Sequence, residues 1–403
     1  MPIYGSFDVL IPKKQYIQKW PVIACDQFTS QPEYWNAMRA TIGDQPSTLH
    51  CIMPEAEFGS ADENKYSEIH RNMRSYLEQD IFTEYKDSFV YVERNLQNGA
   101  IRRGVVGVID FEAYDYSSNS TSPIRTTEKT VVERIPPRMK VRSGASLDLS
   151  HVILLCDDER REIIEPLQGA DGKVIYDLHL LQNGGHIKGK LIDCYEAEKL
   201  RQRIEEYCVR KSEELNGFIF AVGDGNHSLA TAKVCYEELK KTSTDAVAIN
   251  RARYAMVELE NIHDEAQEFE PIHRIIYDSD YKGLIRYLQQ NWCAEKGYPV
   301  EWITREKGGV LYLDREKGVL PIAILQNALD HYLMSHSGRI DYIQGDETLW
   351  KLASKKNSIG FLLPSIPKDD FFRGISNDGV LPRKTFSMGE AEEKRYYLEA
   401  RRL

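Results

Sequence analysis

The sequence has no long hydrophobic run and no closely paired cysteines. No apolar stretch approaches the ~20 residues of a membrane-spanning helix, and the first residues do not combine a basic stretch with a long apolar one. We therefore expect neither export nor membrane insertion. The seven cysteines are widely spread and contain no C-x-x-C pair, which indicates unpaired thiols in a reducing cytoplasm and disfavours a structural zinc site.

The signatures of several enzyme classes are missing as well. The sequence contains no G-K-[ST] ending of a Walker loop, no dinucleotide-binding G-x-G-x-x-G and no G-x-S-x-G nucleophile elbow. The zinc-binding sequence H-E-x-x-H is also absent. An active site must therefore be built from a pattern other than these.

Positive charge is in deficit. Lys and Arg number 52 against 62 Asp and Glu, so the formal net charge is −10 at pH 7 and the overall field repels a nucleic-acid backbone. We expect no nucleic-acid partner. The one strongly basic stretch, Arg134 to Arg142, is open to two interpretations, a solvated basic loop or a cationic site for one small anion. Arg142 is therefore a candidate phosphate-binding residue.

The rest of the composition is that of an ordinary folded protein. The chain has 403 residues, of which 42% are hydrophobic and 28% charged, and this length exceeds what a single hydrophobic core usually supports. We expect two α/β domains, residues 1–278 and 279–403, within a mixed α+β fold class. Because no flexible linker marks the boundary, we expect the two parts to pack closely and to share a site.

The apolar residues recur at helical spacing in some segments and form short β-branched runs in others. Two of the predicted strands, those that flank an Asn-Gly sequence near residue 98, should form a hairpin. We expect helices at Gln31–Thr41, Asn64–Gln79, Glu196–Leu215 and Gly389–Arg402, and strands at Pro21–Ala24, Asp87–Arg94, Arg103–Phe111, Thr130–Arg134 and His151–Cys156.

The most informative segment joins an apolar strand to a helix through a short polar turn. Gly217 to Val222 is a fully apolar run of strand length, and a helix is expected from about Leu229 to Lys241. Between them stands G-D-G-N-H-S, residues 223 to 228. A glycine-containing turn at a helix N-terminus leaves backbone N–H groups pointing outward, and the helix dipole adds partial positive charge. The segment therefore predicts an anion-binding turn.

The side chains of this turn admit two interpretations. In the functional one, Gly223 and Gly225 allow a close backbone approach and Asp224 binds a metal ion or acts as a general base. Asn226, His227 and Ser228 then contact phosphate. In the structural one, these are ordinary turn residues and Ser228 caps the helix.

Polar clusters elsewhere are further candidates for the site. Asp26 follows the first apolar strand, where it either contacts a ligand or caps the next segment. The stretch R-T-T-E-K from Arg125 to Lys129 combines two cations with Glu128, which can bind phosphate and supply a general base, or can form a solvated strand edge.

Two candidates lie in the last third of the chain. His273 and Arg274 stand in an otherwise apolar stretch, where they either form a buried ion pair or face a cleft. Lys384 lies in L-P-R-K-T-F-S, a segment that offers a cation and two hydroxyl groups, although Ser387 can act there as a helix cap.

The ordered landmarks of the chain resemble the domain-of-unknown-function 1015 family. That family typically carries Asp-Gly-His-His-Arg after an apolar strand, and D-G-N-H-S stands here at residues 224 to 228. Other landmarks agree in order along the chain: P-V-I-A-C-D ending at residue 26, L-H-C-I-M-P-E at 49–55, R-T-T-E-K-T at 125–130, I-L-L-C-D-D at 153–158, P-I-H-R at 271–274, F-L-L-P at 361–364 and L-P-R-K-T-F-S at 381–387.

The turn in this motif is in turn similar to the phosphate-binding turn of the ParB/sulfiredoxin-like superfamily, which includes free L-serine kinases. The resemblance implies a ParB/sulfiredoxin-like core, nucleotide binding and phosphoryl transfer to a serine hydroxyl. It also implies that a motif Asp and a separate Glu serve the reaction, here Asp224 and Glu128. The sequence departs from the motif at Asn226 and Ser228, and the loss of the motif arginine removes a bidentate phosphate clamp.

We therefore expect a cytoplasmic, Mg²⁺-dependent small-molecule kinase, with Asp224 as the candidate Mg²⁺ ligand. Its expected partners are a free amino acid, first of all L-serine, and a phosphate donor that is ATP, ADP or pyrophosphate. Two rival hypotheses use the same turn: a non-catalytic nucleotide- or metabolite-binding regulator, and a phosphatase. The oligomeric state is left open by the sequence.

Overall fold

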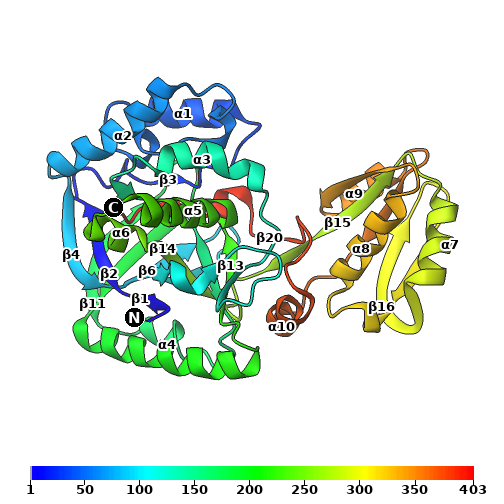
Figure 1. Ribbon diagram of the computed structural model, residues 1–403. Coiled ribbons are helices and arrows are strands. Elements are labelled where there is room, and N and C mark those ends of the chain that lie inside the picture. The colour runs from blue at the N-terminus through cyan, green and yellow to red at the C-terminus, as the bar shows by residue number, and fades with distance from the viewer. Residues whose placement is uncertain (1) are drawn as a thin grey trace. The chain divides into compact units, whose positions relative to one another are not determined.

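The structure is a computed structural model that describes residues 2–403. It contains two compact units, each described here by itself (Figure 1). Unit 1 comprises the chain up to Thr126, Thr130–Gln267 and Glu390–Leu403, and unit 2 comprises Thr127–Lys129 and Glu268–Gly389. This division differs from the two continuous domains expected from the sequence, because the last segment of the chain pairs with strands of unit 1.

Unit 1 is built around a ten-stranded mixed sheet in the order β11-β12-β5-β6-β14-β10-β13-β8-β7, with β1 paired to β6. The central strand β10 is apolar throughout and fully buried, as expected for a strand that is covered on both faces. The strands are β1 (Tyr4–Gly5), β5 (Val90–Asn95), β6 (Ile101–Asp110), β7 (Tyr114–Asp115), β8 (Ile124–Thr126), β10 (Ile153–Cys156), β11 (Gly172–His179), β12 (His186–Ile192), β13 (Phe220–Asp224) and β14 (Tyr254–Asn261).

Helices cover both faces of this sheet. Alternate residues of β6 and β14 belong to two different hydrophobic cores, one completed by α4 and α5 and the other by α1. A third core surrounds α2, and α3 packs between α2 and α5. The helices of unit 1 are α1 (Pro32–Ile42), α2 (Glu63–Glu78), α3 (Ile135–Arg142), α4 (Cys194–Glu214), α5 (Asn226–Thr242) and α6 (Ala246–Ala252).

Three two-stranded sheets complete unit 1. They pair β2 (Phe7–Pro12) with β4 (Phe82–Ser88), β21 (Tyr396–Tyr397) with β3 (Val22–Ile23), and β22 (Arg401–Arg402) with β9 (Leu147–Asp148). The second and third of these pairs bring the C-terminal segment back to strands of the first half of the chain.

Two secondary-structure predictions were wrong. The charged helix expected at Gly389–Arg402 is a single 3-10 turn, η7 (Ala391–Glu393), followed by β21 and β22. Its charges do not form a solvated face, because Arg395 and Glu399 are buried and ion-paired with each other at 2.8 Å. The strand expected at Thr130–Arg134 is a 3-10 turn, η4 (Val132–Arg134), that runs into α3, where proline near the helix start favours helix over strand.

Unit 2 is a smaller antiparallel sheet with helices, in the order β17-β16-β19-β15-β18, with β20 paired to β15. The mixed α/β class expected from the sequence is therefore confirmed. The strands are β15 (Phe269–Tyr277), β16 (Cys293–Ile303), β17 (Gly308–Leu313), β18 (Arg339–Gln344), β19 (Ile359–Leu362) and β20 (Phe386–Met388), and the helices are α7 (Tyr281–Asn291), α8 (Pro321–Leu333), α9 (Asp346–Ala353) and α10 (Lys368–Asp378).

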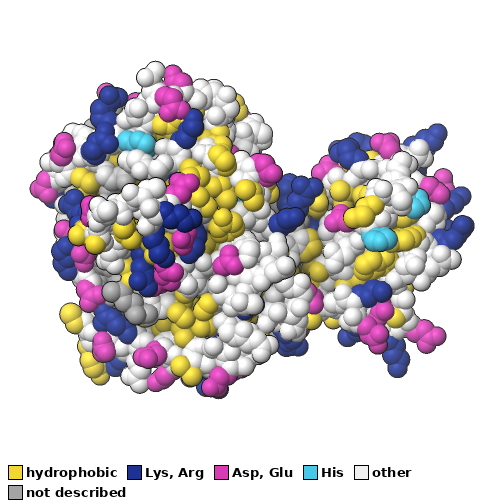
Figure 2. Space-filling model, viewed as in Figure 1, with side chains coloured by type: hydrophobic (Ala, Val, Ile, Leu, Met, Phe, Trp, Pro, Cys, Tyr) yellow, Lys and Arg dark blue, Asp and Glu magenta, His cyan; other side chains and the backbone are white. Residues whose placement is uncertain are grey.

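The surface of each unit carries charges of both signs (Figure 2), and the cysteines are unpaired, as expected from the sequence. On the face seen in Figure 2, Lys and Arg side chains are interspersed with Asp and Glu side chains on each unit. All seven cysteines are free thiols. Within residues 2–403, none of the helices has both the length and the hydrophobicity that crossing a membrane requires.

Candidate functional site

The polar turn of unit 1 connects β13 directly to α5. Gly225 adopts a left-handed conformation with φ of 76°, and a Cβ atom there would lie 3.0 Å from the Cα of Val152, so that glycine alone fits without strain. The helix begins at Asn226, three residues earlier than expected, and no side chain caps it. The prediction that Ser228 caps the helix is therefore wrong. The N–H groups of the first turn have no partner within the helix and point toward its N-terminus.

Asp224, the last residue of β13, is held by two partners. Its Oδ1 accepts the N–H of Gly225 at 2.8 Å, and its Oδ2 lies 3.4 Å from Nζ of Lys394. Both side chains are largely buried, with 20% and 13% exposed, so water screens this ion pair less than one at the surface. Lys394 thus places a cation beside the turn, and no pattern in the sequence had marked this residue as a candidate.

A second carboxylate, that of Asp26, lies near the turn, and His151 connects it to Ser228. Nε2 of His151 lies 3.7 Å from Oδ2 of Asp26 and 3.4 Å from the hydroxyl oxygen of Ser228, and its Nδ1 lies 2.7 Å from the hydroxyl oxygen of Tyr397. The Tyr397 oxygen accepts the N–H of Cys25 at 3.3 Å, so its proton is free to donate to Nδ1. We infer that Nε2 carries the imidazole proton and directs it toward the Asp26 carboxylate.

The electrostatic surroundings keep Asp26 ionised. Burial raises the pKa of this carboxyl group, but the electrostatic interaction and hydrogen bond with His151 outweigh burial. The Gln27 amide and the Lys394 ammonium lower the pKa further, and the net result lies well below the usual range for Asp. Asp26 therefore presents proton-accepting oxygens at neutral pH. The structure brings Asp26 to the turn. A position in the site was one of the two alternatives that the sequence left open for this residue.

His227 is neutral in this environment. Burial, together with the guanidinium groups of Arg138 and Arg134, lowers its pKa to about 4, while Asp26 acts in the opposite direction. Its Nε2 accepts the N–H of Val131 at 3.2 Å, which leaves Nδ1–H as the only ring donor. Contact of His227 with phosphate would therefore use one N–H group rather than a positive charge.

The amide of Asn226 is fixed in one orientation. The hydroxyl group of Thr126, at the end of β8, donates to Oδ1 of Asn226, and β8 runs parallel to β13 beside the turn. With the amide oxygen engaged, the NH₂ group of Asn226 is the side that can donate to an anion. Gly223, the residue before Asp224, belongs to the end of β13.

The two arginines predicted to bind phosphate in unit 1 have other partners. Nε of Arg125 donates to the carbonyl of Ser122 at 2.9 Å, and the guanidinium group lies over the ring of Phe218. Phe218 precedes the first residue of β13, whereas the turn follows the last residue of that strand. Nη1 of Arg142 pairs with the buried carboxylate of Asp148. The structure therefore does not bring Arg125 to the turn, and it gives Arg142 a counter-ion of its own.

The basic stretch from Arg134 to Arg142 is not a solvated loop. It forms η4 and α3, and carboxylates from α2 and its preceding loop neutralise it: Arg138 pairs with Glu55 at 2.8 Å and Lys140 with Glu63 at 2.6 Å. The loop predicted from the sequence was therefore wrong, and the anion-site interpretation stays a prediction. Sequence patterns could not reveal these partners, because they lie about 80 positions away along the chain.

The remaining predicted site residues belong to unit 2, where they form a second polar cluster. Oε1 of Glu128 accepts the N–H of Thr385 at 3.1 Å, and Glu128 also forms a β-bridge with Leu381. Lys384 lies in the same segment, in a left-handed backbone conformation, with its ammonium group 5.8 Å from the centre of the Tyr342 ring. Lys129 directly follows Glu128 in the chain.

His273 and Arg274 of β15 have structural partners. Nε2 of His273 lies 2.8 Å from Oδ1 of Asp346, and its Nδ1 accepts the N–H of Leu363 at 3.1 Å. Arg274 is fully buried and donates to the carbonyl of Lys384 at 2.9 Å, besides bonds to other carbonyls and to an amide on α8. Of the two sequence interpretations, a pair with a carboxylate describes His273, whereas Arg274 is satisfied by neutral carbonyl and amide oxygens instead of a counter-ion.

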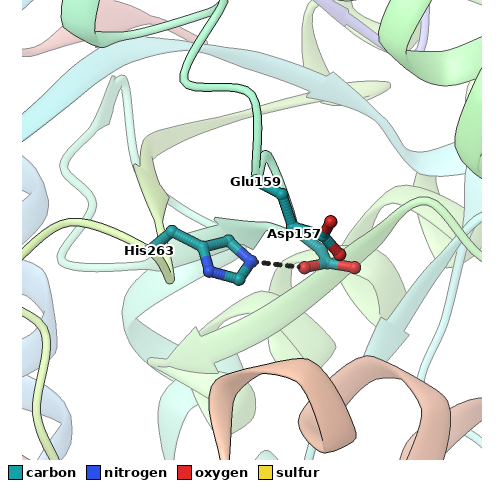
Figure 3. Close-up of side chains that lie close together, drawn as sticks. All are labelled: Asp157, Glu159 and His263. Atoms are coloured by element: carbon teal, nitrogen blue, oxygen red, sulfur yellow. Dashed lines mark hydrogen bonds and ion pairs between the residues drawn. The ribbon is translucent and has the colours of Figure 1, made fainter.

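A separate group of potential metal ligands lies at the end of β10, where Asp157, Glu159 and His263 converge (Figure 3). Nε2 of His263 is 2.7 Å from one oxygen of Asp157, and Nζ of Lys211 is 2.8 Å from the other. The ammonium group already neutralises the best-placed carboxylate, so a divalent ion would have to displace it. This donor set therefore fits an internal ion-pair network better than a metal site.

Solved structures similar to this chain share little of its sequence. A free serine kinase in complex with AMP is 10% identical, with a TM-score of 0.37, over 72% of this chain and 90% of that one. SbnI from Staphylococcus aureus, with a C-terminal truncation, is 8% identical, with a TM-score of 0.36, over 70% and 83% of the two chains. A conserved hypothetical protein from Pyrococcus furiosus is 12% identical, with a TM-score of 0.34, over 70% and 90%.

The sequence comparisons add one assignment. None of the curated proteins matches the chain. The profile of a family described as "Protein of unknown function (DUF1015)" matches residues 7–367, which is most of the sequence, and this extent agrees with the ordered landmarks noted above. The chain therefore belongs to the DUF1015 family.

Proposed function

We propose that this protein is a phosphotransferase that moves a phosphoryl group from a nucleotide or another phosphate donor to the hydroxyl group of a free amino acid, with L-serine as the first acceptor to test. The observation that carries the proposal is the pairing of an ionised Asp26 carboxylate with an uncapped helix N-terminus in unit 1. Phosphoryl transfer needs both, a proton acceptor for the hydroxyl group and donors for the phosphate oxygens.

In the proposed reaction, the donor phosphate binds at the N-terminus of α5. The first-turn N–H groups, the NH₂ group of Asn226 and Nδ1–H of His227 donate to its oxygens, and the Lys394 ammonium balances its charge. The glycine at position 225 supports this arrangement, because a side chain there would clash with Val152 and shift the turn. These groups together replace the guanidinium clamp that the sequence lacks at Ser228.

Asp26 is the residue that we assign as general base. The acceptor oxygen forms a bond to phosphorus as the bond to the donor's leaving oxygen breaks, and the hydroxyl proton passes to the Asp26 carboxylate. His151 holds this carboxylate in position, and Tyr397 fixes the tautomer of His151. Asp224 is less suited to be the base, because Gly225 and Lys394 already engage its oxygens. Glu128 likewise holds the backbone of Thr385.

A magnesium ion that displaced the Lys394 ammonium group from Asp224 would also find a suitable donor set here. Asp26 and Asp224 both interact electrostatically with the Lys394 ammonium group. Mg²⁺ in proteins is usually held by one or two carboxylates together with substrate phosphates and water. These two residues would hold a Mg²⁺ ion that arrives with the donor, and the ion would neutralise charge on the transferred group.

The test is a mass-spectrometric screen of free amino acids with ATP, ADP and pyrophosphate as donors. We expect O-phosphoserine from L-serine with at least one donor, and a loss of about 10²- to 10⁴-fold in kcat for Asp26→Asn. Asp177→Asn is the matched control, because this carboxylate lies in the β11–β12 hairpin and pairs with His186 at 2.7 Å. Absence of product with every donor and acceptor would refute the proposal.

A non-catalytic nucleotide- or metabolite-binding regulator is the alternative. The observation that favours it is the Asp224–Lys394 ion pair, because the ammonium group already occupies one carboxylate of the turn. A regulator would be stabilised thermally by AMP, ADP or ATP, would lose this stabilisation in Lys394→Met, and would form no product. A phosphatase that uses the same site is the third candidate. Incubation with O-phosphoserine distinguishes it from the other two, because a phosphatase would release inorganic phosphate.

A further inference from the structure

Beside the turn, unit 1 contains a partly open cavity of about 100 Å³ whose apolar part the proposed reaction does not use. It lies between α2, α3, α5 and the chain that follows residue 50, and its walls are mainly apolar. Cys51, Met53 and Met73 form part of the wall, and each is at most 3% exposed. His151 and Ser228 line its polar end.

The polar side chains around the cavity already have partners. Arg138 pairs with Glu55, and Arg142 pairs with Asp148. The hydroxyl group of Thr231 donates to the carbonyl of residue 227. A ligand anion would compete with these carboxylates for the arginines, and a nucleobase would leave most of its ring nitrogens and amino groups without hydrogen bonds. The walls therefore suit a hydrocarbon group.

The cavity adjoins the proposed reaction site, because His151 and Ser228 belong to both. Resting on the proposed function, we propose that it binds an aliphatic substituent of the acceptor, so that the preferred substrate is a 3-hydroxy amino acid with a branched apolar side chain rather than serine itself. A cavity of ~150 Å³ lined by apolar side chains takes a benzene ring, so one of about 100 Å³ takes a group of roughly four carbon atoms.

The binding part of this inference can be tested without turnover. Isobutanol is the probe, and saturation transfer from the protein to its methyl signals is measured by ligand-observed NMR on the full chain. We expect transfer with the wild-type protein and its loss in Ala145→Leu, which fills the cavity. Ala170→Leu is the control, because Ala170 is equally half-buried but packs against a different core.

Val141→Phe serves as a second filling variant should Ala145→Leu fail to fold. Loss of the isobutanol signal in a folded filling variant, but not in Ala170→Leu, supports the inference. Absence of transfer with the wild-type protein, or transfer that persists in a folded filling variant, overturns it.

The specificity part uses the kinase assay. We expect kcat/KM for 3-hydroxyleucine to exceed that for serine by at least about 10-fold, and Ala145→Leu to remove this preference while serine turnover is retained. Turnover of serine with no such preference overturns the inference and leaves the proposed function intact. Absence of turnover with both acceptors and every donor overturns the proposed function and, with it, the assignment of the cavity to an acceptor, whatever the isobutanol experiment shows.

Discussion

The imidazole of His227 should remain neutral until the pH falls to about 4. Burial removes water from the charged form, Arg138 and Arg134 repel it, and protonation of Nε2 would break the bond from Val131 N–H. A difference between the ordinary value of 6.5 and about 4 corresponds to ~3 kcal/mol, which we reduce to about 1.5 kcal/mol because the ring is partly exposed.

The sign of the pH dependence follows from the lowered pKa. A group that binds its proton less tightly in the folded state contributes stability that is fully present above pH 6.5 and is lost as the pH falls toward 4. Urea unfolding of the wild-type protein should therefore lose about 1.5 kcal/mol more than His227→Gln between pH 7 and pH 4.

The direct measurement is a histidine NMR titration, in which the His227 resonance is assigned by its absence from the His227→Gln spectrum. His186→Gln provides the control, because that ring lies on the exposed hairpin beside Asp177. A His227 ring that titrates above pH 6 would refute the reasoning, and with it the role of a neutral ring in phosphate contact. Addition of a bound phosphate should raise the pKa, since an anion stabilises the imidazolium.

Three further substitutions test the packing around the turn. Asp148→Asn leaves the buried guanidinium of Arg401 without its 3.0 Å carboxylate partner and should cost about 3–5 kcal/mol in urea unfolding. Tyr397→Phe removes the donor to His151 and should lower the free energy of unfolding by ~1 kcal/mol and reduce kcat more than it changes KM. Gly225→Ala should destabilise by about 1–2 kcal/mol, because of the left-handed φ and the contact with Val152, and a melting temperature within 1 °C of wild type would contradict this.

The local parts of the fold were predictable from the sequence. Regular apolar spacing located α1, α2 and α4 to within a few residues, and the two β-branched runs around residue 98 do pair as the hairpin β5–β6. The strand, turn and helix around Asp224 were confirmed in the same way, because an apolar run and two glycines specify this geometry within a dozen residues.

The partners of the turn could not be predicted in that way. His151 and Lys394 lie about 70 and 170 positions from Asp224, and no periodic pattern links them. The segment around Lys394 was misassigned as a helix because its alternating charges resemble a solvated helical face. In the folded chain several of those charges are buried and paired: Arg395 bonds Glu258 at 2.7 Å, a partner contributed by β14. Which buried charges pair with each other depends on the tertiary fold, so composition alone cannot predict the pairs.

The return of Glu390–Leu403 to unit 1 also determines when the turn can acquire its partners during synthesis. All of residues 268–389 leave the ribosome before Lys394 and Tyr397 do, so β13 and α5 emerge long before the cation and the hydroxyl group that complete their surroundings. Closing so long a loop adds only a few kcal/mol of entropy cost, because that cost grows with the logarithm of loop length. A nascent chain stalled inside unit 2 would therefore expose an unneutralised Asp224 and an unanchored His151.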